Sequence, residues 1–386
     1  MKRRILILAV LLLVGGAYLW YRSRPGLNGV VLHRHQEFLV QMLQALPEPQ
    51  QADVKDYLAR QQPDWEAQLD RFQSGSAPQL TASLQMHMQV AVQPQLKPVP
   101  IVEGQLQSVL AQPPLSAAPP LTPERRALLL RFAASVGRLE VKSGADYSLR
   151  GTGFVVAPGL VATNCHVVRT VAQQGPSPVD TFLLAPVDLR IDFGDTPAHQ
   201  ERLEFRITAL RPCPGEGLDV AFLQTEFASV DRHTTLPPPL ILTSAEPQRL
   251  AAGSPLNVAQ IGYPDLHDPN LTGGTPTQDL FLQFDAGQYA KFYTPGAITT
   301  VEAKSGIDFV FHIVSTWSGE SGSPLLDLET GNVVAVDSCC DRTNGSLPAP
   351  SDLSCATRLL VSPANLGIGG WSVVRDPVLG AMLPRS

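Results

Sequence analysis

Ser321 lies in a short segment whose composition could support nucleophilic catalysis. The segment Gly319-Glu320-Ser321-Gly322-Ser323-Pro324 places this serine between two glycines and is flanked by apolar stretches. Glycines allow a tight turn in which backbone N–H groups point into a cavity instead of pairing in a sheet. A serine hydroxyl is a weak nucleophile alone, so this interpretation requires a base and an orienting acid elsewhere in the chain.

Two upstream segments provide a candidate base and a candidate acid. His166 follows an apolar stretch that ends at Thr163, and Asp219 precedes another from Val220 to Leu223. The order along the chain is histidine, aspartate, serine, as in chymotrypsin and not as in subtilisin or the α/β-hydrolases. Ser323 also replaces the second glycine of a G-x-S-x-G elbow, which disfavours an α/β-hydrolase further.

These segments resemble the trypsin-like serine peptidases, in particular the bacterial branch with the HtrA and V8-type enzymes. The resemblance covers residues from Ser135 to Leu366 and implies an all-β domain of two six-stranded barrels, with the site in the cleft between them. The motifs that carry it are Gly151-Thr152-Gly153-Phe154, Thr163-Asn164-Cys165-His166-Val167-Val168, Leu218-Asp219-Val220-Ala221, Ile261-Gly262-Tyr263-Pro264 and the segment Gly319 to Pro324.

The resemblance implies a role for each residue of the candidate site. Ser321 is expected to be the nucleophile, His166 the general base and Asp219 the group that orients the imidazole. The backbone N–H groups of Gly319 and Ser321 are expected to form the oxyanion hole. The substrate is then a protein or peptide, and the chemistry needs neither a metal nor an organic cofactor.

The resemblance also places a specificity pocket at Ser315, Thr316, Asp337 and Ser338. V8-type enzymes that select glutamate carry a threonine matching Thr316, but a histidine where this chain has Asp337. An acid there repels a glutamate side chain. Two alternatives stay open for Asp337: its carboxylate reaches the pocket and favours lysine or arginine, or it turns away, bonds nearby backbone N–H groups and leaves an uncharged pocket.

Many short apolar segments broken by glycine and proline support the all-β expectation. A helix is expected from Pro123 to Phe132 with Thr122 as its cap, and a closing helix or tail from Pro363 to Asp376. The expected strands are Ser135–Val141, Gly151–Ala157, Leu160–Thr163, Leu203–Leu210, Val220–Gln224, Asn257–Tyr263, Leu280–Asp285, Ala297–Val301, Phe309–Ser315 and Val333–Ser338.

The 386 residues leave room for more than one domain, and a net charge of −6 excludes a basic footprint for nucleic acid. The expected division is a signal-anchor or signal segment (1–25), a small N-terminal region of unknown role (26–92), a proline-rich linker (93–123), the peptidase domain (124–372) and a C-terminal tail (373–386). The sequence does not indicate an oligomeric state.

Residues 1–25 have the pattern of a membrane anchor. Three basic residues precede an apolar run from Ile5 to Tyr21 that ends in aromatic residues, and no A-x-A site follows. We expect an uncleaved anchor with the peptidase outside the cytoplasm, on the periplasmic side of a bacterial inner membrane. A cleaved secretion signal is the alternative.

Helical spacing is expected from Leu32 to Leu46 and in two short pieces near Tyr57 and Trp65, whereas Leu84 to Val92 alternates like a strand. The region is expected to be a packing layer, with a partner-binding module as the alternative. His33 and His35 are expected to be solvated surface residues.

Five cysteines are too few for a disulfide scaffold in a chain of this length. Cys165 is expected to be a small buried residue. Outside the cytoplasm, Cys339 or Cys340 could pair with Cys355.

A second class of function also remains open, namely a catalytically silent trypsin-fold protein that only binds at the membrane; an intact triad favours the enzyme.

Overall fold

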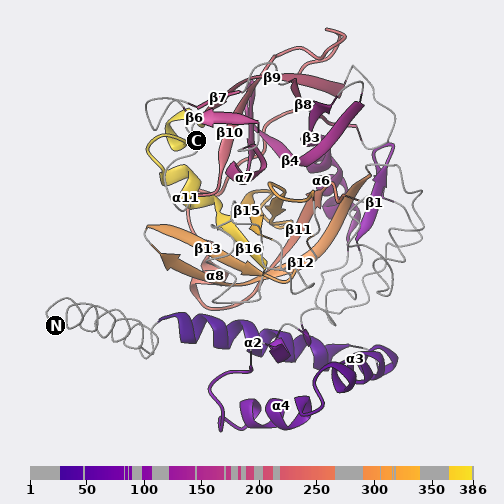
Figure 1. The fold of residues 1–386 in the computed structure, drawn as a ribbon, viewed down its shortest axis with the longest axis vertical. Helices are drawn as coiled ribbons and strands as arrows, with labels where there is room; N and C mark the ends of the chain where they lie inside the picture. Colours follow the sequence, from indigo (N-terminus) through magenta and orange to yellow (C-terminus); the bar gives the residue numbers. More distant parts are fainter. Residues whose placement is uncertain are drawn as a thin grey trace, which may run out of the picture.

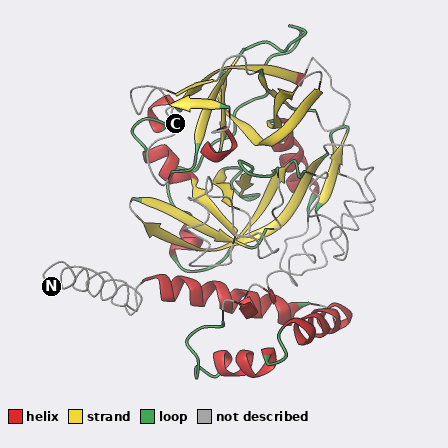
Figure 2. Cartoon of the chain, in the orientation of Figure 1, coloured by secondary structure: helices red, strands yellow, loops and turns green. Residues whose placement is uncertain are grey.

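The structure is a computed structural model of the chain, and Figures 1 and 2 show its helices and strands. It describes residues 27–46, 48–81, 83–85, 87–88, 98–106, 121–143, 146–168, 171–174, 181–183, 188–194, 203–211, 218–265, 290–304, 306–314, 316, 319–339 and 365–384. The predicted membrane segment, the predicted strand Leu280–Asp285 and the residues Cys340 and Cys355 lie outside these ranges. Within them, no helix has the length and apolar character needed to span a bilayer.

Six antiparallel strands form the first closed barrel, in the order β10-β5-β4-β3-β8-β9. Inward-facing side chains such as Leu139, Val155 and Phe205 make its apolar core. Five of the strands confirm the sequence prediction, and β8 was not predicted. The strands are β3 (Val136–Ser143), β4 (Asp146–Ala157), β5 (Leu160–Thr163), β8 (Leu189–Asp192), β9 (Glu204–Arg211) and β10 (Ala221–Thr225), with a separate hairpin of β6 (Ala172–Gln174) and β7 (Thr181–Leu183).

The second barrel has the strand order β11-β14-β15-β16-β13-β12 and is closed by pairing between β11 and β12. The prediction that Pro363–Asp376 is a helix or tail is partly wrong. Its first half is β16, which pairs with β13 on one side and β15 on the other. The elements are β11 (Leu256–Gly262), β12 (Lys291–Lys304), β13 (Ile307–His312), β14 (Pro324–Leu326), β15 (Val333–Cys339) and β16 (Asn365–Gly369), followed by α11 (Gly370–Arg375) and the short 3-10 helix Gly380–Met382.

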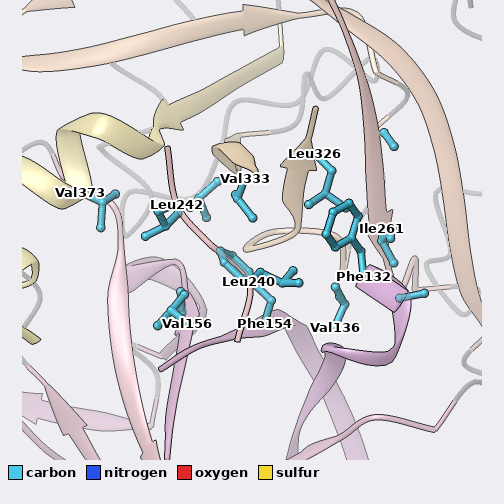
Figure 3. Close-up of a cluster of buried hydrophobic side chains, with 14 of the residues drawn as sticks. Phe132, Val136, Phe154, Val156, Leu240, Leu242, Ile261, Leu326, Val333 and Val373 are labelled. Atoms are coloured by element: carbon cyan, nitrogen blue, oxygen red, sulfur yellow. The ribbon is translucent and has the colours of Figure 1, made fainter. Parts of the chain in front are cut away.

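Apolar side chains from both barrels meet in one buried cluster (Figure 3). Phe154 and Val156 come from β4 of the first barrel, and Ile261 and Leu326 come from β11 and β14 of the second. Leu240, on the connection between the barrels, lies in the same cluster. This shared core fixes the two barrels against each other, and so fixes the residues that each contributes to their junction.

A helix and a hairpin precede the barrels. Helix α6 (Pro123–Ala134) confirms the prediction, since the Thr122 hydroxyl accepts a hydrogen bond from the Arg125 N–H at 3.3 Å. Within the predicted linker, β1 (Val99–Val102) pairs with β12 and with β2 (Gln105–Leu106). This part of the proline-rich segment is therefore a strand of the second barrel's sheet and not a free extended linker.

Three helices form a layer beside the second barrel (Figure 1): α2 (Leu27–Ala45), α3 (Glu48–Gln61) and α4 (Trp65–Gln73). We call them the helical layer. Residues 83–85 and 87–88 are also helical, so the strand predicted there is wrong where it is described. Leu84 and Met88 are both fully buried, and residues four apart share one face of a helix as readily as alternate residues share one face of a strand.

A buried ion network lies on the strands of the first barrel. The Arg138 guanidinium contacts the carboxylates of Glu140 at 2.9 Å and Asp192 at 2.6 Å, and all three side chains are fully buried. Arg190 contacts Glu140 at 2.9 Å and Glu204 at 2.6 Å. Each arginine therefore compensates two carboxylates that the fold has removed from water.

Replacing Arg138 with methionine is expected to lower the free energy of unfolding by about 3–5 kcal/mol, because Asp192 and Glu140 stay buried with fewer cationic partners. Urea unfolding measures the change. The matched control is Arg206→Met, since Arg206 is exposed on β9 of the same barrel and its replacement should cost less than about 0.5 kcal/mol. Equal losses in the two variants would contradict this role of the network.

Candidate active site

The predicted base and acid lie next to each other at the ends of paired strands. β5 leads into the short helix α7 (Cys165–Val168), which carries His166, and Asp219 directly precedes β10. β5 and β10 are antiparallel neighbours, with Thr163 opposite Ala221. Asp219 Oδ2 lies 2.7 Å from His166 Nδ1, and Asp219 Oδ1 accepts a hydrogen bond from the His166 backbone N–H at 3.0 Å.

A third hydrogen bond holds the Asp219 carboxylate from the second barrel. The Ser338 hydroxyl on β15 donates to Asp219 Oδ2 at 2.7 Å. Burial of Asp219 opposes ionisation, but the charge of His166 and the hydrogen bonds from His166 and Ser338 outweigh it and keep the pKa of this carboxyl below its ordinary value. Asp219 therefore stays ionised, which fixes the Nδ1–H tautomer of His166 and leaves Nε2 as an acceptor.

The turn that carries Ser321 needs glycine at two positions. Gly319 and Gly322 both have φ of +89°, a conformation that side chains with a Cβ rarely adopt. A Cβ on Gly322 would also overlap the carbonyl oxygen of Thr152. The Thr152 N–H donates to the Ser321 carbonyl and the Thr152 hydroxyl donates to the Gly319 carbonyl, both at 2.9 Å. Thr152 on β4 thus holds the turn from the first barrel.

The same contacts bring Ser321 to the side of the molecule that carries His166. Gly151 lies between them, because a Cβ there would be 2.8 Å from Val167 and 3.0 Å from the Ser321 carbonyl oxygen. Both functional side chains keep access to solvent: Ser321 is partly exposed, and the His166 side chain is 19% exposed. A substrate can therefore reach both groups from outside.

Two amides are available where the sequence predicts an oxyanion hole. The N–H groups of Gly319 and Ser321 have no hydrogen-bond acceptor among the residues that the structure describes. Donors left without a partner in a rigid turn are suited to the negative charge of a tetrahedral intermediate.

The residues predicted for the specificity pocket are only partly described. Ser315 lies outside the described residues. The Thr316 hydroxyl donates to the Val314 carbonyl at 3.3 Å, and Asn365 on β16 donates to the same carbonyl at 2.6 Å. Ser338 is buried and engaged with Asp219.

Asp337 is fully buried and bonded to side chains of the second barrel. Its Oδ1 lies 3.1 Å from His312 Nε2, and its Oδ2 lies 3.5 Å from Gln260 Nε2. Burial raises the pKa of the Asp337 carboxyl above its ordinary value, although the hydrogen bond and charge of His312 act in the opposite direction. The carboxylate also accepts a hydrogen bond from the Ser338 backbone N–H, which agrees with the alternative of an Asp337 that turns away and bonds nearby backbone N–H groups. The side-chain partners His312 and Gln260 were not expected.

Sequence reasoning assigned no role to Thr152 or His312. Thr152 lies between Gly151 and Gly153 in one of the motifs that carry the family resemblance. These flanking glycines, which allow a close approach of another backbone, were the sequence signal that could have indicated its role. His312 is a single histidine at the end of an apolar strand, and such a pattern gives no signal. Among the described residues, no group of three or more histidine, cysteine, aspartate or glutamate side chains is placed to hold a metal ion.

Cys165, beside the histidine, is buried as predicted, but it is also disulfide-bonded. The expectation of a small buried residue is therefore confirmed, whereas the disulfide was not predicted from the sequence. Pairing of Cys355 with Cys339 or Cys340 stays a prediction, because Cys340, Cys355 and the Cys339 side chain are outside the described residues.

Two six-stranded barrels that bring histidine and aspartate from one barrel to a serine turn of the other define the trypsin-like class of serine peptidases. Residues 151–336 match the family model of the trypsin-like peptidase domain. The chain therefore contains a trypsin-like serine peptidase domain, and it is a hydrolase of the serine endopeptidase class.

Solved structures with a similar fold were also found. The active form of the Rv3671c protease from M. tuberculosis is 20% identical over 70% of this chain and 91% of its own, with a TM-score of 0.40. The serine endoprotease from Yersinia pestis is 16% identical over 67% of this chain and 68% of its own, with a TM-score of 0.38. No curated protein matches the sequence significantly.

Proposed function

We propose that this domain hydrolyses peptide bonds through an acyl-enzyme, with Ser321, His166 and Asp219 as a catalytic triad. The observation that carries the proposal is the 2.7 Å contact between His166 Nδ1 and Asp219 Oδ2. With Nδ1 engaged by Asp219, Nε2 is the imidazole nitrogen that accepts the proton in this proposal, on the side of the molecule where the Ser321 turn packs.

The proposed reaction has two halves. Ser321 Oγ attacks the scissile carbonyl while His166 Nε2 takes its proton, and the imidazolium then delivers that proton to the leaving amine. In the second half, water attacks the carbonyl of the acyl-enzyme, with His166 again as the base, and Ser321 is released. Asp219 stays ionised and stabilises the imidazolium. The Gly319 and Ser321 amides bind the oxyanion, and loss of one such donor typically raises the activation free energy by about 3 kcal/mol.

A fluorophosphonate probe tests this proposal against the alternative of a silent binding protein. Such a probe reacts with a serine only when a base activates it, so the wild-type protein is expected to label. Ser321→Ala and His166→Ala are expected to label at least about a hundredfold less, since nucleophile and base act as a unit. A folded wild-type protein that does not label would support the binding protein.

We further propose that the specificity pocket does not select basic side chains. The Asp337 carboxylate is buried and already bonded to His312 at 3.1 Å, which supports an uncharged pocket beside Thr316. Wild-type protein and the isosteric Asp337→Asn variant are therefore both expected to cleave a peptide library without preference for lysine or arginine. A basic preference in the wild type that disappears in Asp337→Asn would contradict this proposal.

Finally, we propose that the peptidase acts outside the cytoplasm, attached through residues 1–25. The basic flank of the apolar run supports this orientation, and so does the disulfide at Cys165, since disulfides persist in oxidising compartments. In cells quenched with acid, Cys165 is expected to resist alkylation until a reductant is added. Alkylation without a reductant would contradict an extracytoplasmic location.

A further inference from the structure

The helical layer packs against two strands of the second barrel through buried side chains of α2. His35 is fully buried, contrary to the prediction that it is a surface residue, whereas the His33 side chain is 39% exposed. Ala297 on β12 and Ile313, which follows β13, belong to the apolar cluster of the helical layer and not to the barrel core. The layer and these strands therefore share one core.

A polar contact sits within this apolar interface. His35 Nδ1 lies 2.9 Å from Thr299 Oγ1 on β12, and the Thr299 hydroxyl donates to the Phe311 carbonyl at 3.0 Å. Because the hydroxyl hydrogen is used by Phe311, His35 must be the donor in the first contact. Thr299 occupies the irregularity in the β12–β13 pairing, between Ile298 and Thr300, so His35 is bonded to β12 at the point where its register shifts.

This interface is connected with the inside of the second barrel by three successive residues, Phe311, His312 and Ile313. Successive side chains along an extended segment point to opposite faces. Phe311 lies near His35, with ring centres 6.4 Å apart, and Ile313 packs on the helical layer. His312, between them, turns the other way and donates to Asp337 at 3.1 Å.

Asp337 and its neighbour Ser338 hold two parts of the proposed triad, the turn that carries Ser321 and the carboxylate of Asp219. The Asp337 N–H donates to the Ser323 carbonyl at 2.9 Å, and the Asp337 carbonyl accepts from the Gly322 N–H at 3.0 Å. These bonds hold the turn that presents Ser321. The adjacent Ser338 hydroxyl bonds Asp219 at 2.7 Å. A displacement of this short piece of β15 would therefore misplace the nucleophile and the acid together.

We propose that the helical layer positions the active site and that His35 is the positioning residue through which it does so. The path runs from His35 to Thr299, along Phe311 and His312, and on to Asp337. The layer then sets the catalytic rate without touching substrate, and any agent that loosens α2 from the barrel lowers that rate. The kinetic part of this inference rests on the proposed function.

The kinetic test compares His35→Leu, His35→Asn and the control His33→Leu in the full chain. Leucine removes the donor to Thr299, so kcat is expected to fall about five- to tenfold with KM within twofold, the size of a typical coupling between sites. Asparagine keeps an N–H donor near the place of Nδ1 and should stay within about twofold of wild type. His33 contacts Pro78 and Glu37 within the helical region, and His33→Leu should leave kcat unchanged.

A second readout does not depend on turnover. NMR titration of the His166 imidazole is expected to show its pKa lowered by about half a unit in His35→Leu, because a displaced Asp219 stabilises the imidazolium less. If His35→Leu does not fold, Thr299→Val removes the same contact from the barrel side. An unchanged His166 titration in a variant with lost activity would overturn the positioning role.

A double-mutant cycle completes the test. If His35 acts through His312, then His35→Leu and His312→Leu together should cost no more than the larger single effect, whereas independent effects add. Additive losses would overturn the path. A wild-type protein that neither cleaves peptides nor labels would refute the proposed function alone, because the His166 titration still decides whether His35 reaches the site.

Discussion

Ser321→Ala is expected to lower kcat by about a millionfold while the protein stays folded. The loss is this large because the triad acts as a unit: without the hydroxyl, the proton acceptor His166 and its partner Asp219 have nothing to activate. The side chain is small and partly exposed, so the unfolding midpoint should change little. Turnover of a peptide substrate, measured beside the urea midpoint, checks both statements.

The matched control for this variant is Ser254→Ala. Ser254 is exposed in the turn after the short helix α8 (Gln248–Ala251) of the same domain, and its replacement should leave kcat within twofold of wild type. Retention of more than about one part in a thousand of wild-type kcat by Ser321→Ala would mean that another group is the nucleophile.

Asp219→Asn is expected to lower kcat about ten-thousandfold. Asp219 accepts hydrogen bonds from the His166 ring, the His166 backbone N–H and the Ser338 hydroxyl, and an amide offers one oxygen in place of two. Its NH₂ group would then donate to Nδ1 and favour the tautomer with hydrogen on Nε2. That tautomer cannot take the proton of Ser321. Steady-state kinetics on the folded variant measures the loss.

Ser338→Ala gives the graded comparison. It removes one of the three hydrogen bonds to Asp219 and leaves the carboxylate in place, so roughly a ten- to hundredfold loss is expected, the usual worth of a hydrogen bond to a charged group. If Asp219→Asn costs no more than Ser338→Ala, then the imidazole of His166 is oriented by some other group.

Local sequence patterns predicted the part of the site that local structure decides. His166 and Asp219 follow and precede short apolar strands, and pairing of those strands brings them together. Five of the six strands of the first barrel were predicted for the same reason, because a closed barrel needs a regular apolar face on each strand. The serine turn was predicted from its glycines, whose φ values of +89° few other residues adopt.

What the sequence did not predict depends on partners far along the chain. β16 has the sequence Asn-Leu-Gly-Ile-Gly, which has little intrinsic preference for a strand, and its pairing with β13 and β15 decides its conformation. Likewise, nothing near His35 in the sequence indicates burial, which follows from Thr299 and Phe311. His312 and Asp337 were not paired in advance, because no local pattern relates residues on different strands.

The hairpin of β1 and β2 has a consequence for the newly made chain. β1 pairs with residues 291–293 of β12, which leave the ribosome long after it. At translation rates of roughly 5–20 residues per second, the strand Val99–Val102 waits on the order of ten seconds or more for its partner. During that time it is an apolar segment open to wrong pairing. Pro100, within the strand, lacks a backbone N–H and so weakens such pairing, which makes this proline a safeguard during biosynthesis.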